Sequence, residues 1–371
     1  MIRIFSKTLL CTIAAVALAA CQQAPTNKPL EEVAPKAKNI ILLIGDGMGV
    51  SQVSSSFYYG DQDPNFKRFK QIGLINTTPI SGKITDSAAG ATAFSAGQKS
   101  YNAAIGVDKD TVAIKTILEI AAEKNRKTGV ISTSSITHAT PASFYAHVKH
   151  RNMQEEIASQ LVEAPVDFFA GGGIKFFDRR KDNANLYASL VEKGFQMDST
   201  ALNKPAQWDI NQKYGYLLAN DGMPRMLDGR GDFLPNATQM ALDYLSQDTS
   251  GFFLMVEGSQ IDWGGHANDA EYLITEVLDF DKAIGAALDF AEKQGNTLVI
   301  VTADHETGGY TLAGTDTDSG RDYGQITGTF STGGHSTTLI PVFAYGPGAE
   351  NFSGIYQNND IFQKMLDLVS W

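Results

Sequence analysis

The stretch that decides the fold is "NIILLIGDGMG", Asn39 to Gly49. A continuous apolar run ends here in a glycine-rich turn that contains Asp46. Such a run, without polar alternation, is typical of a strand buried on both faces of a parallel sheet. Polar residues that follow the strand lie where open α/β sheets bind ligands, outside the carboxyl ends of their strands.

The same pattern recurs along the chain. Further apolar runs closed by glycine or polar residues cover Thr128–Ser135, Val166–Gly173, Gly251–Asp262, Asn296–Gly309 and Leu339–Gly348. Helical patterns lie between several of them, at Thr111–Lys124, Asn236–Gln247 and Asp269–Lys293. This alternation predicts an α/β fold with a doubly wound, mostly parallel central sheet, helices on both faces and short insertions. We expect a loop at Ala313–Gly334 and a peripheral lobe at 174–234, the segment that is hardest to interpret.

The N-terminus resembles a targeting segment. Arg3 and Lys7 precede a short apolar run, Thr8–Ala20, which is too short for a membrane-spanning helix of ~20 residues. "LAAC", ending at Cys21, resembles the lipobox of bacterial lipoproteins; an ordinary secretory signal is the alternative. We therefore expect an exported protein of the periplasm or cell envelope: a signal peptide at 1–20, a lipidated cysteine and flexible tether at 21–38, and one α/β domain at 39–371. The lipid on Cys21 would be its only membrane attachment.

The charge and the cysteine content limit which partners and which covalent cross-links the protein can have. The formal net charge is −11, which argues against nucleic acid as a partner because phosphate-backbone binding needs clustered Lys and Arg. The two cysteines, Cys11 and Cys21, both lie in the leader, so the folded body has no thiol for a disulfide. So acidic a protein can act on anionic substrates only if bound cations reverse the local field.

The polar residues at the strand and loop ends form a metal-ligand set. Imidazoles and carboxylates are ligands for Zn²⁺, and oxygen ligands alone suit Mg²⁺. Two short pairs, Asp262 with His266 and Asp304 with His305, come from different strands. Two metal ions ~4 Å apart are a common device for in-line displacement at phosphorus. All the polar residues at these strand and loop ends, ligand candidates and others, are Asp46, Asp86, Ser87, His138, Thr140, Arg151, Glu257, Asp262, His266, Asp304, His305 and His335.

The segment "TDSAAGATAF", Thr85 to Phe94, has two interpretations. Asp86 and Ser87 stand before small residues that begin a helix, and both residue types are preferred N-caps. By itself the segment favours a capped helix. A serine at a helix start can also serve as a nucleophile, because the helix N-terminus favours negative charge.

Six motifs, in order along the chain, resemble the alkaline phosphatase family. They are "NIILLIGDGMG", "TDSAAGATAFSAG", "THATPASFYAHVKHR", "EGSQIDWGGH", "VTADHETGG" and "GGHST", the last around His335. They run from Asn39 to about Gly348, nearly the whole mature chain. The resemblance implies a phosphate monoester hydrolase that forms a phosphoserine and releases inorganic phosphate, and it also implies a homodimer. The short loop at Ala313–Gly334 weakens the implication of a dimer, because larger members carry bulky insertions there.

Position by position, the resemblance implies the following roles. Ser87 would be the nucleophile, Arg151 would bind the non-bridging phosphate oxygens, and Asp86 would orient Arg151. One zinc ion would be held by Asp262, His266 and His335, and a second by Asp46, Asp304 and His305. A third ion, usually Mg²⁺, would be held by Asp46, Thr140 and Glu257.

Two positions near the third metal vary within the family, and this chain has His138 and Trp263 there. His138 would contact the ion directly, hydrogen-bond a water on it, or be a buried histidine without a metal role. Trp263 has no charge, so it cannot bind phosphate as lysine would, and product release would differ. His147 and His150 lie on the segment leading to Arg151, and we expect no metal role for either.

Related chemistries fit the sequence less well. Sulfatases need a C/S-x-P-x-R context, which "SAAGA" after Asp86 lacks. Phosphodiesterases of the same superfamily typically use Thr as nucleophile and lack the arginine fork for a dianionic phosphate. Ser87 and Arg151 therefore favour monoesters, although diesterase side activity stays open. A lipoprotein that only binds metal or phosphate is disfavoured by the intact nucleophile and ligand set.

Overall fold

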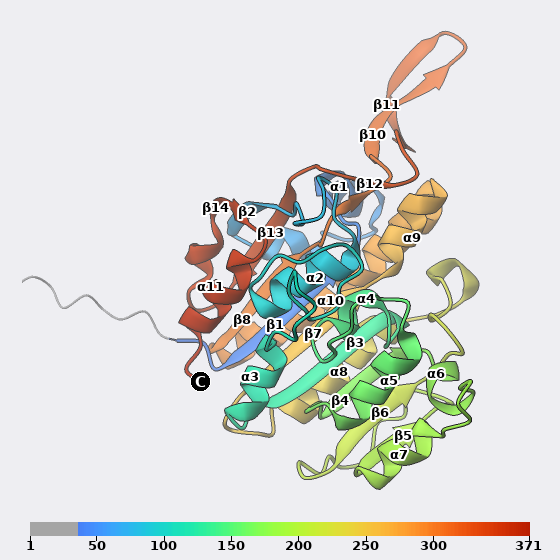
Figure 1. The fold of residues 1–371 in the computed structure, drawn as a ribbon. Helices are drawn as coiled ribbons and strands as arrows, with labels where there is room; N and C mark the ends of the chain where they lie inside the picture. The colour runs from blue at the N-terminus through green and yellow to red at the C-terminus, as the bar shows by residue number, and fades with distance from the viewer. Residues whose placement is uncertain (1–35) are drawn as a thin grey trace, which may run out of the picture. The chain divides into compact units, whose positions relative to one another are not determined.

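The computed structural model describes residues 36–371, so the predicted leader and most of the tether lie outside the described residues. Ten strands form the central sheet (Figure 1). In spatial order they are β14 (Gly354–Gln357), β2 (Gln71–Asn76), β13 (Ile340–Tyr345), β8 (Thr297–Thr302), β1 (Asn39–Gly45), β7 (Phe252–Gly258), β3 (Lys127–Ser135), β4 (Phe168–Gly172), β6 (Lys213–Leu217) and β5 (Phe195–Asp198).

The strand predicted from "NIILLIG" lies at the centre of this sheet. Every residue of β1, β7 and β8 is buried, as the unbroken apolar runs predicted. β1 pairs in parallel with both neighbours, Ile40 standing opposite Phe253 on one side and Leu298 on the other. β13 is antiparallel to β8 and β2, and the remaining pairs are parallel. The predicted mostly parallel α/β fold is confirmed.

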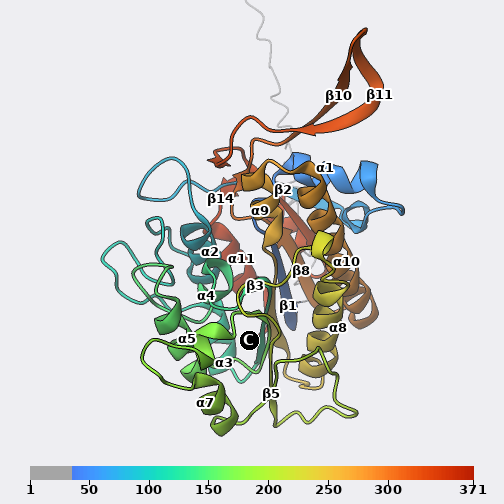
Figure 2. The ribbon, with the colours of Figure 1, turned by 90° about the vertical axis from the view of Figure 1, so that its right-hand side faces the viewer.

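Helices cover both faces of the sheet. Figure 2 shows α8 and α10 on one side and α2, α3, α5 and α7 on the other. The α-helices are α1 (Val50–Tyr59), α2 (Ser87–Ala96), α3 (Ile117–Glu123), α4 (Ala139–Ala142), α5 (Gln154–Glu163), α6 (Lys175–Asp178), α7 (Leu186–Glu192), α8 (Phe233–Leu245), α9 (Gln260–Ala267), α10 (Ala270–Gln294) and α11 (Asp360–Leu368). Short 3₁₀ turns are η1 (Asn65–Arg68), η2 (Met226–Asp228) and η3 (Ala349–Phe352).

The helix expected at Thr111–Lys124 is shorter than predicted. α3 begins at Ile117 because Thr116 closes a capping box: its hydroxyl accepts from Glu119 N, and the Glu119 carboxylate accepts from Thr116 N. The other two predicted helices match α8 and α10 to within a few residues.

Two other expectations were wrong. Ala313–Gly334 is mostly not a loop: β10 (Thr311–Thr317) and β11 (Gly320–Thr329) form an antiparallel hairpin that projects outward in both ribbon views. Its threonines favour extended backbone even though polar residues are frequent there. Residues 174–234 do not form a separate lobe either, because β5 and β6 within them extend the central sheet past β4.

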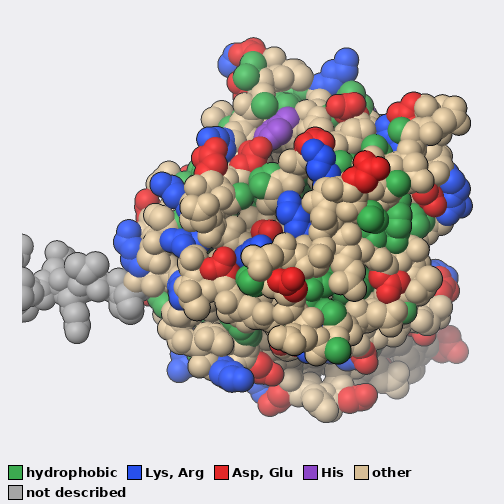
Figure 3. Space-filling view, turned by 90° about the horizontal axis from the view of Figure 1, so that it is seen from below, with side chains coloured by type: hydrophobic (Ala, Val, Ile, Leu, Met, Phe, Trp, Pro, Cys, Tyr) green, Lys and Arg blue, Asp and Glu red, His purple; other side chains and the backbone are tan. Residues whose placement is uncertain are grey.

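The surface carries charges of both signs. On the face seen in Figure 3, positive and negative side chains are intermingled. Exposed pairs such as Lys193 with Glu163, 2.6 Å apart, and Lys67 with Asp63, 2.8 Å apart, contribute little stability each. Between residues 36 and 371, no helix combines the length and apolar character needed to cross a bilayer.

Candidate active site

The predicted site residues meet at the carboxyl ends of β1, β7 and β8. Asp46 follows β1, Glu257 lies near the end of β7, and Asp304 and His305 follow β8. A two-stranded ladder then pairs β12 (His335–Ser336) with β9 (Glu306–Thr307), which brings His335 next to His305. Their rings stack with centroids 3.5 Å apart. Residues as far apart in the chain as Asp46 and His335 thereby lie at one edge of the sheet.

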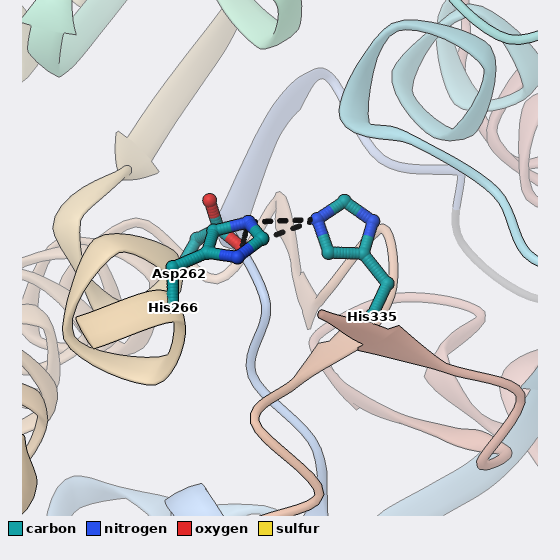
Figure 4. Close-up of side chains that lie close together, drawn as sticks. All are labelled: Asp262, His266 and His335. Carbon is teal, nitrogen blue, oxygen red and sulfur yellow. Dashed lines mark hydrogen bonds and ion pairs between the residues drawn. The ribbon is translucent and has the colours of Figure 1, made fainter. Parts of the chain in front are cut away.

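The first ligand cluster contains Asp262, His266 and His335 (Figure 4). Asp262 and His266 are four residues apart on α9, so they share one face of the helix. His266 Nε2 lies 3.1 Å from His335 Nε2, and Asp262 Oδ1 lies 3.4 Å and 3.5 Å from these two atoms.

Backbone carbonyls fix which nitrogen of each ring faces this cluster. His266 Nδ1 lies 2.8 Å from Gly333 O, and His335 Nδ1 lies 2.8 Å from Thr85 O. Because a carbonyl only accepts, each Nδ1 carries the proton, and in a neutral ring Nε2 keeps its lone pair. Two lone pairs and a carboxylate oxygen that face one another are a donor set for a cation.

The second cluster contains Asp46, Asp304 and His305, all fully buried. His305 Nε2 lies 3.3 Å from Asp46 Oδ1 and 3.4 Å from Asp304 Oδ2. Asp46 Oδ2 and Asp304 Oδ2 are buried and have no hydrogen-bond partner among the described residues. An unpaired buried carboxylate oxygen is costly, so this cluster also fits a cation.

The third cluster contains Asp46, His138 and Glu257, and Thr140 lies next to Glu257. Ser132 and Ser259 donate to Glu257 Oε2 at 2.5 Å and 2.6 Å, while Oε1 has no partner within the described part of the chain. The Thr140 hydroxyl and His138 Nδ1 are likewise buried without a partner. These polar atoms fit a hard cation and its ligands.

Burial and like charge perturb the acids of these clusters. Burial, followed by the charges of Asp304, Asp262 and Glu257, raises the pKa of Asp46 well above its usual value. Burial raises the pKa of Glu257 to about 7. Burial and the charge of Asp262 raise the pKa of Asp304 to about 6. Carboxylates so close together need cations to remain ionised together.

The histidines and Asp262 respond differently. Burial lowers the pKa of His305 to about 3, so its ring is neutral and able to ligate. Burial favours a raised pKa for Asp262, but its interactions with His335, His305 and His266 outweigh burial and lower the pKa. Asp262 therefore remains a carboxylate.

Ser87 is the first residue of α2, and Asp86 is its N-cap. Asp86 Oδ1 accepts from Ala89 N at 3.0 Å, as the capping interpretation predicted. Ser87 Oγ lies 3.3 Å from His305 Nε2 and 3.5 Å from Asp46 Oδ1, two ligand atoms of the second cluster. Gly90 makes this approach possible, because a Cβ there would stand 2.8 Å from Asp304 Cβ.

Arg151 is held beside Ser87 by two side chains. Its Nη1 donates to Asp86 Oδ2 at 3.1 Å, and its Nη2 donates to His138 Nε2 at 3.2 Å. Nothing else within residues 36–371 accepts from this guanidinium, so its remaining hydrogens are available to bind an anion. Asp86 thus caps the helix with one oxygen and contacts Arg151 with the other.

The two variable positions lie side by side. The His138 and Trp263 rings meet edge to face, with centroids 6.0 Å apart. Burial, followed by the charge of Arg151, lowers the pKa of His138 to about 3, which keeps the ring neutral. His147 instead joins loops away from this site, with Nδ1 2.7 Å from Gly106 O and Nε2 3.1 Å from Glu119 Oε1. His150 is exposed and accepts from Asn152 N.

Sequence reasoning missed several supporting groups. Thr307 Oγ1 lies 3.1 Å from His305 Nδ1 and donates to Asp262 Oδ1 at 2.5 Å, so it links two clusters. Ser132 and Ser259, which orient Glu257, were also missed. The threonine two residues after His305 in "DHET" was a usable signal, because a histidine ligand commonly has a partner on its other nitrogen.

Comparison with known proteins agrees with this geometry. The alkaline phosphatase family matches residues 37–322. Alkaline phosphatase 3 of Bacillus subtilis is 35% identical over 417 residues, spanning 90% of this chain and 89% of that protein. Alkaline phosphatase of Escherichia coli strain K12 is 33% identical over 408 residues, spanning 89% of this chain and 85% of that protein.

Solved structures agree as well. The alkaline phosphatase from the Antarctic bacterium TAB5 matches with a TM-score of 0.88 and 56% identity, covering 91% of this chain and 99% of that chain. A variant of that enzyme with one histidine replaced by glutamate is described with Mg bound in a site called M3. The chain therefore belongs to the alkaline phosphatase family and is a metal-dependent phosphomonoesterase.

Proposed function

We propose that this enzyme hydrolyses phosphate monoesters through a phosphoserine on Ser87, with two Zn²⁺ ions and one Mg²⁺ ion. The observation that carries the proposal is the position of Ser87 Oγ, which lies 3.3 Å from His305 Nε2 and 3.5 Å from Asp46 Oδ1. A serine hydroxyl is a weak nucleophile at its ordinary pKa and needs a base or a metal for activation. His305, which lies beside Ser87, would serve as a metal ligand and not as a free base, so the second cluster would be the activating group.

The donor sets support the metal assignment. Asp262, His266 and His335 would hold one zinc ion, and Asp46, Asp304 and His305 the other, because mixed nitrogen and carboxylate sets suit Zn²⁺. When bound, these ions stabilise negative charge on the oxygens around phosphorus and lower the pKa of a hydroxyl or a water.

The residues of the chain then perform the following steps. The Arg151 guanidinium binds two non-bridging oxygens of the substrate and, with the positive N-terminal end of α2, orients phosphorus toward Ser87. Ser87 Oγ forms a bond to phosphorus as the bond to the leaving alcohol oxygen breaks on the opposite side. Water then attacks the phosphoserine in line, releasing inorganic phosphate and regenerating the serine.

The third site would hold Mg²⁺ through Asp46, Thr140 and Glu257. Arg151 can only donate, so neutral His138 accepts from it at Nε2 and carries its proton on Nδ1. A protonated Nδ1 can donate toward a ligand of the ion but cannot itself ligate, and this favours an indirect role for His138. The TAB5 variant in which glutamate replaces a histidine has Mg bound in its M3 site, so a site of this family can hold Mg.

We also propose export, with lipid attachment at Cys21 and use of residues 21–38 as a tether. Support comes from the sequence alone, since the leader lies outside the described residues. Homodimer formation likewise stays a prediction from the resemblance.

Replacing Ser87 tests the mechanism. Ser87→Ala should lower kcat for p-nitrophenyl phosphate by at least about a thousandfold. Metal content by mass spectrometry should be unchanged. Acid quenching of the wild type with substrate should yield a phosphopeptide containing Ser87, absent from the variant. Ser95→Ala on the same helix is the matched control. A Ser87→Ala enzyme that turns over at the wild-type rate would refute the proposal.

A further inference from the structure

A turn formed by Asn102 and Ala103 lies between two segments of the proposed site. Ala104 N donates to Tyr101 O at 3.1 Å, which closes the turn. Asn102 is exposed, whereas Ala104 and Ile105, directly after the turn, are fully buried. The turn is therefore anchored in the core, while its exposed asparagine side chain is available for hydrogen bonds.

The backbone of Ala103 connects Asp86 to Arg151. Its N–H donates to Asp86 Oδ2 at 3.0 Å, and its carbonyl accepts from Arg151 N at 2.8 Å. The same Asp86 oxygen accepts from Arg151 Nη1 at 3.1 Å. The three residues thus form a closed ring of hydrogen bonds, which fixes the position of the guanidinium relative to the start of α2.

Ala103 has a backbone conformation that residues with a Cβ seldom adopt. Its φ is +72°, in the left-handed region. Such strain persists only where the surrounding structure holds it, and it is frequent at functional sites. Here the hydrogen bonds to Asp86 and Arg151 stabilise the strained conformation of Ala103.

The side chain of Asn102 binds the segment that leads to Ser87. Its Oδ1 accepts from Asp86 N at 3.2 Å, and its Nδ2 donates to Ile84 O at 3.0 Å. Between these two residues, the carbonyl of Thr85 accepts from His335 Nδ1 at 2.8 Å. The amide of Asn102 therefore holds the carbonyl that orients the His335 ring.

The other side of the turn is tied to the segment that leads to Arg151. Ile105 and Val148 exchange two backbone hydrogen bonds, each 3.0 Å long, and the Tyr101 hydroxyl donates to Lys149 O at 3.1 Å. These contacts do not involve the Asn102 side chain. Loss of that side chain would loosen residues 84–86 while Arg151 stays attached to the turn, so the spacing between Arg151 and the start of α2 would vary.

We propose that Asn102 is a positioning residue for phosphate ester hydrolysis. Through the turn, it fixes the spacing between Arg151 and Ser87 and the orientation of His335. It acts through Asp86 and Thr85, not by contact with the substrate. The inference rests on the roles proposed above for Ser87, Arg151 and His335.

Steady-state kinetics of the full, metal-loaded Asn102→Ala enzyme test the proposal, with p-nitrophenyl phosphate as substrate and inorganic phosphate as inhibitor. Each lost hydrogen bond corresponds to roughly a two- to tenfold change in binding. KM and the phosphate inhibition constant should therefore both rise at least about threefold. A variant that is merely less stable would lose active enzyme and so lower the apparent kcat, but it would keep both constants.

Zinc release gives a second measurement that does not depend on activity. If Asn102 holds the carbonyl that orients His335, Asn102→Ala should lose zinc to a chelator at least about threefold faster than the wild type. Zinc release at the wild-type rate would overturn the part of the proposal that concerns His335.

Two further variants keep the test decisive. Ser81→Ala removes the hydroxyl that accepts from Asn102 N at 2.9 Å, and it decides the question if Asn102→Ala does not fold: the phosphate inhibition constant should rise at least about twofold. Asn351→Ala is the matched control, because it loses an asparagine hydrogen bond to Gly348 O in η3, at the opposite ends of the strands. Its KM, phosphate inhibition and zinc release should equal those of the wild type.

Arg151→Ala separates this inference from the proposed function. If Arg151→Ala raises the phosphate inhibition constant and Asn102→Ala leaves both KM and that constant unchanged, the positioning role of Asn102 is overturned and the proposed function stands. If Arg151→Ala also leaves the constant unchanged, the role proposed for Arg151 fails, and the inference fails with it.

Discussion

Substitution of Asp86 tests the site most directly, because the two carboxylate oxygens of Asp86 bind different groups. Oδ1 caps α2 through Ala89 N, and Oδ2 accepts from Ala103 N and Arg151 Nη1, all at 3.0–3.1 Å. Asp86→Ala removes all three contacts. The lost cap costs about 1 kcal/mol, and the orphaned Ala103 N–H adds about 1 kcal/mol. Each kcal/mol shifts Tm by roughly 2–4 °C in domains of 150–250 residues and by less in a larger chain, so we expect Tm to fall by a few degrees.

The effect on catalysis should come from the loss of the hydrogen bond between Oδ2 and Arg151. A hydrogen bond to a charged group contributes about 1.5–3 kcal/mol, so an unrestrained Arg151 should lower kcat/KM by roughly 10- to 100-fold. Asp86→Asn can still cap the helix through its amide oxygen, but it has lost the charge that holds Arg151. It should therefore lose less stability than Asp86→Ala while losing a similar share of kcat/KM.

The assay is steady-state hydrolysis of p-nitrophenyl phosphate, with inhibition by inorganic phosphate as the measure of Arg151 binding and Tm as the measure of the cap. Thr116→Ala, which removes the N-cap of α3, is the matched control: Tm should fall and kcat/KM should not. If Asp86→Asn keeps wild-type kcat/KM and wild-type phosphate inhibition, Asp86 does not position Arg151.

Three further predictions concern metals, product release and the N-terminus. After chelation, Glu257 and Asp304 in the folded protein, with pKa values of about 7 and about 6, hold protons that the unfolded chain has already released. The stability of the metal-free protein should therefore fall as the pH rises from about 5 to about 8. A Tm of the EDTA-treated protein that stays flat or rises over this range would contradict the assignment. Metal-loaded protein should not show this fall in stability, and adding zinc to the EDTA-treated protein should abolish the fall. Trp263→Lys should tighten inhibition by inorganic phosphate, and an unchanged inhibition constant would remove Trp263 from the substrate pocket. Cys21→Ala should move the enzyme from the membrane fraction to the soluble fraction; equal partition of both proteins would eliminate the lipid anchor.

The sequence was informative where one local rule governs the chain. The apolar runs predicted β1, β7 and β8 because a strand buried on both faces has no polar position. It was less informative at edges: β2 and β14 were not predicted, since Gln71–Asn76 is only partly buried and its pattern is mixed. The β10–β11 hairpin was mistaken for a loop because its polar residues concealed an extended strand pair.

The candidate site shows the same division. The sequence by itself determined which side chains are available to the site, and its motifs predicted the ligands and the nucleophile among them. It could not determine that Thr307 joins His305 to Asp262, or that Asp86 divides its oxygens between a helix and Arg151. Only the tertiary structure decided those contacts. Hydrogen-bond partners and burial depend on segments far apart in the chain that meet only once the sheet has formed.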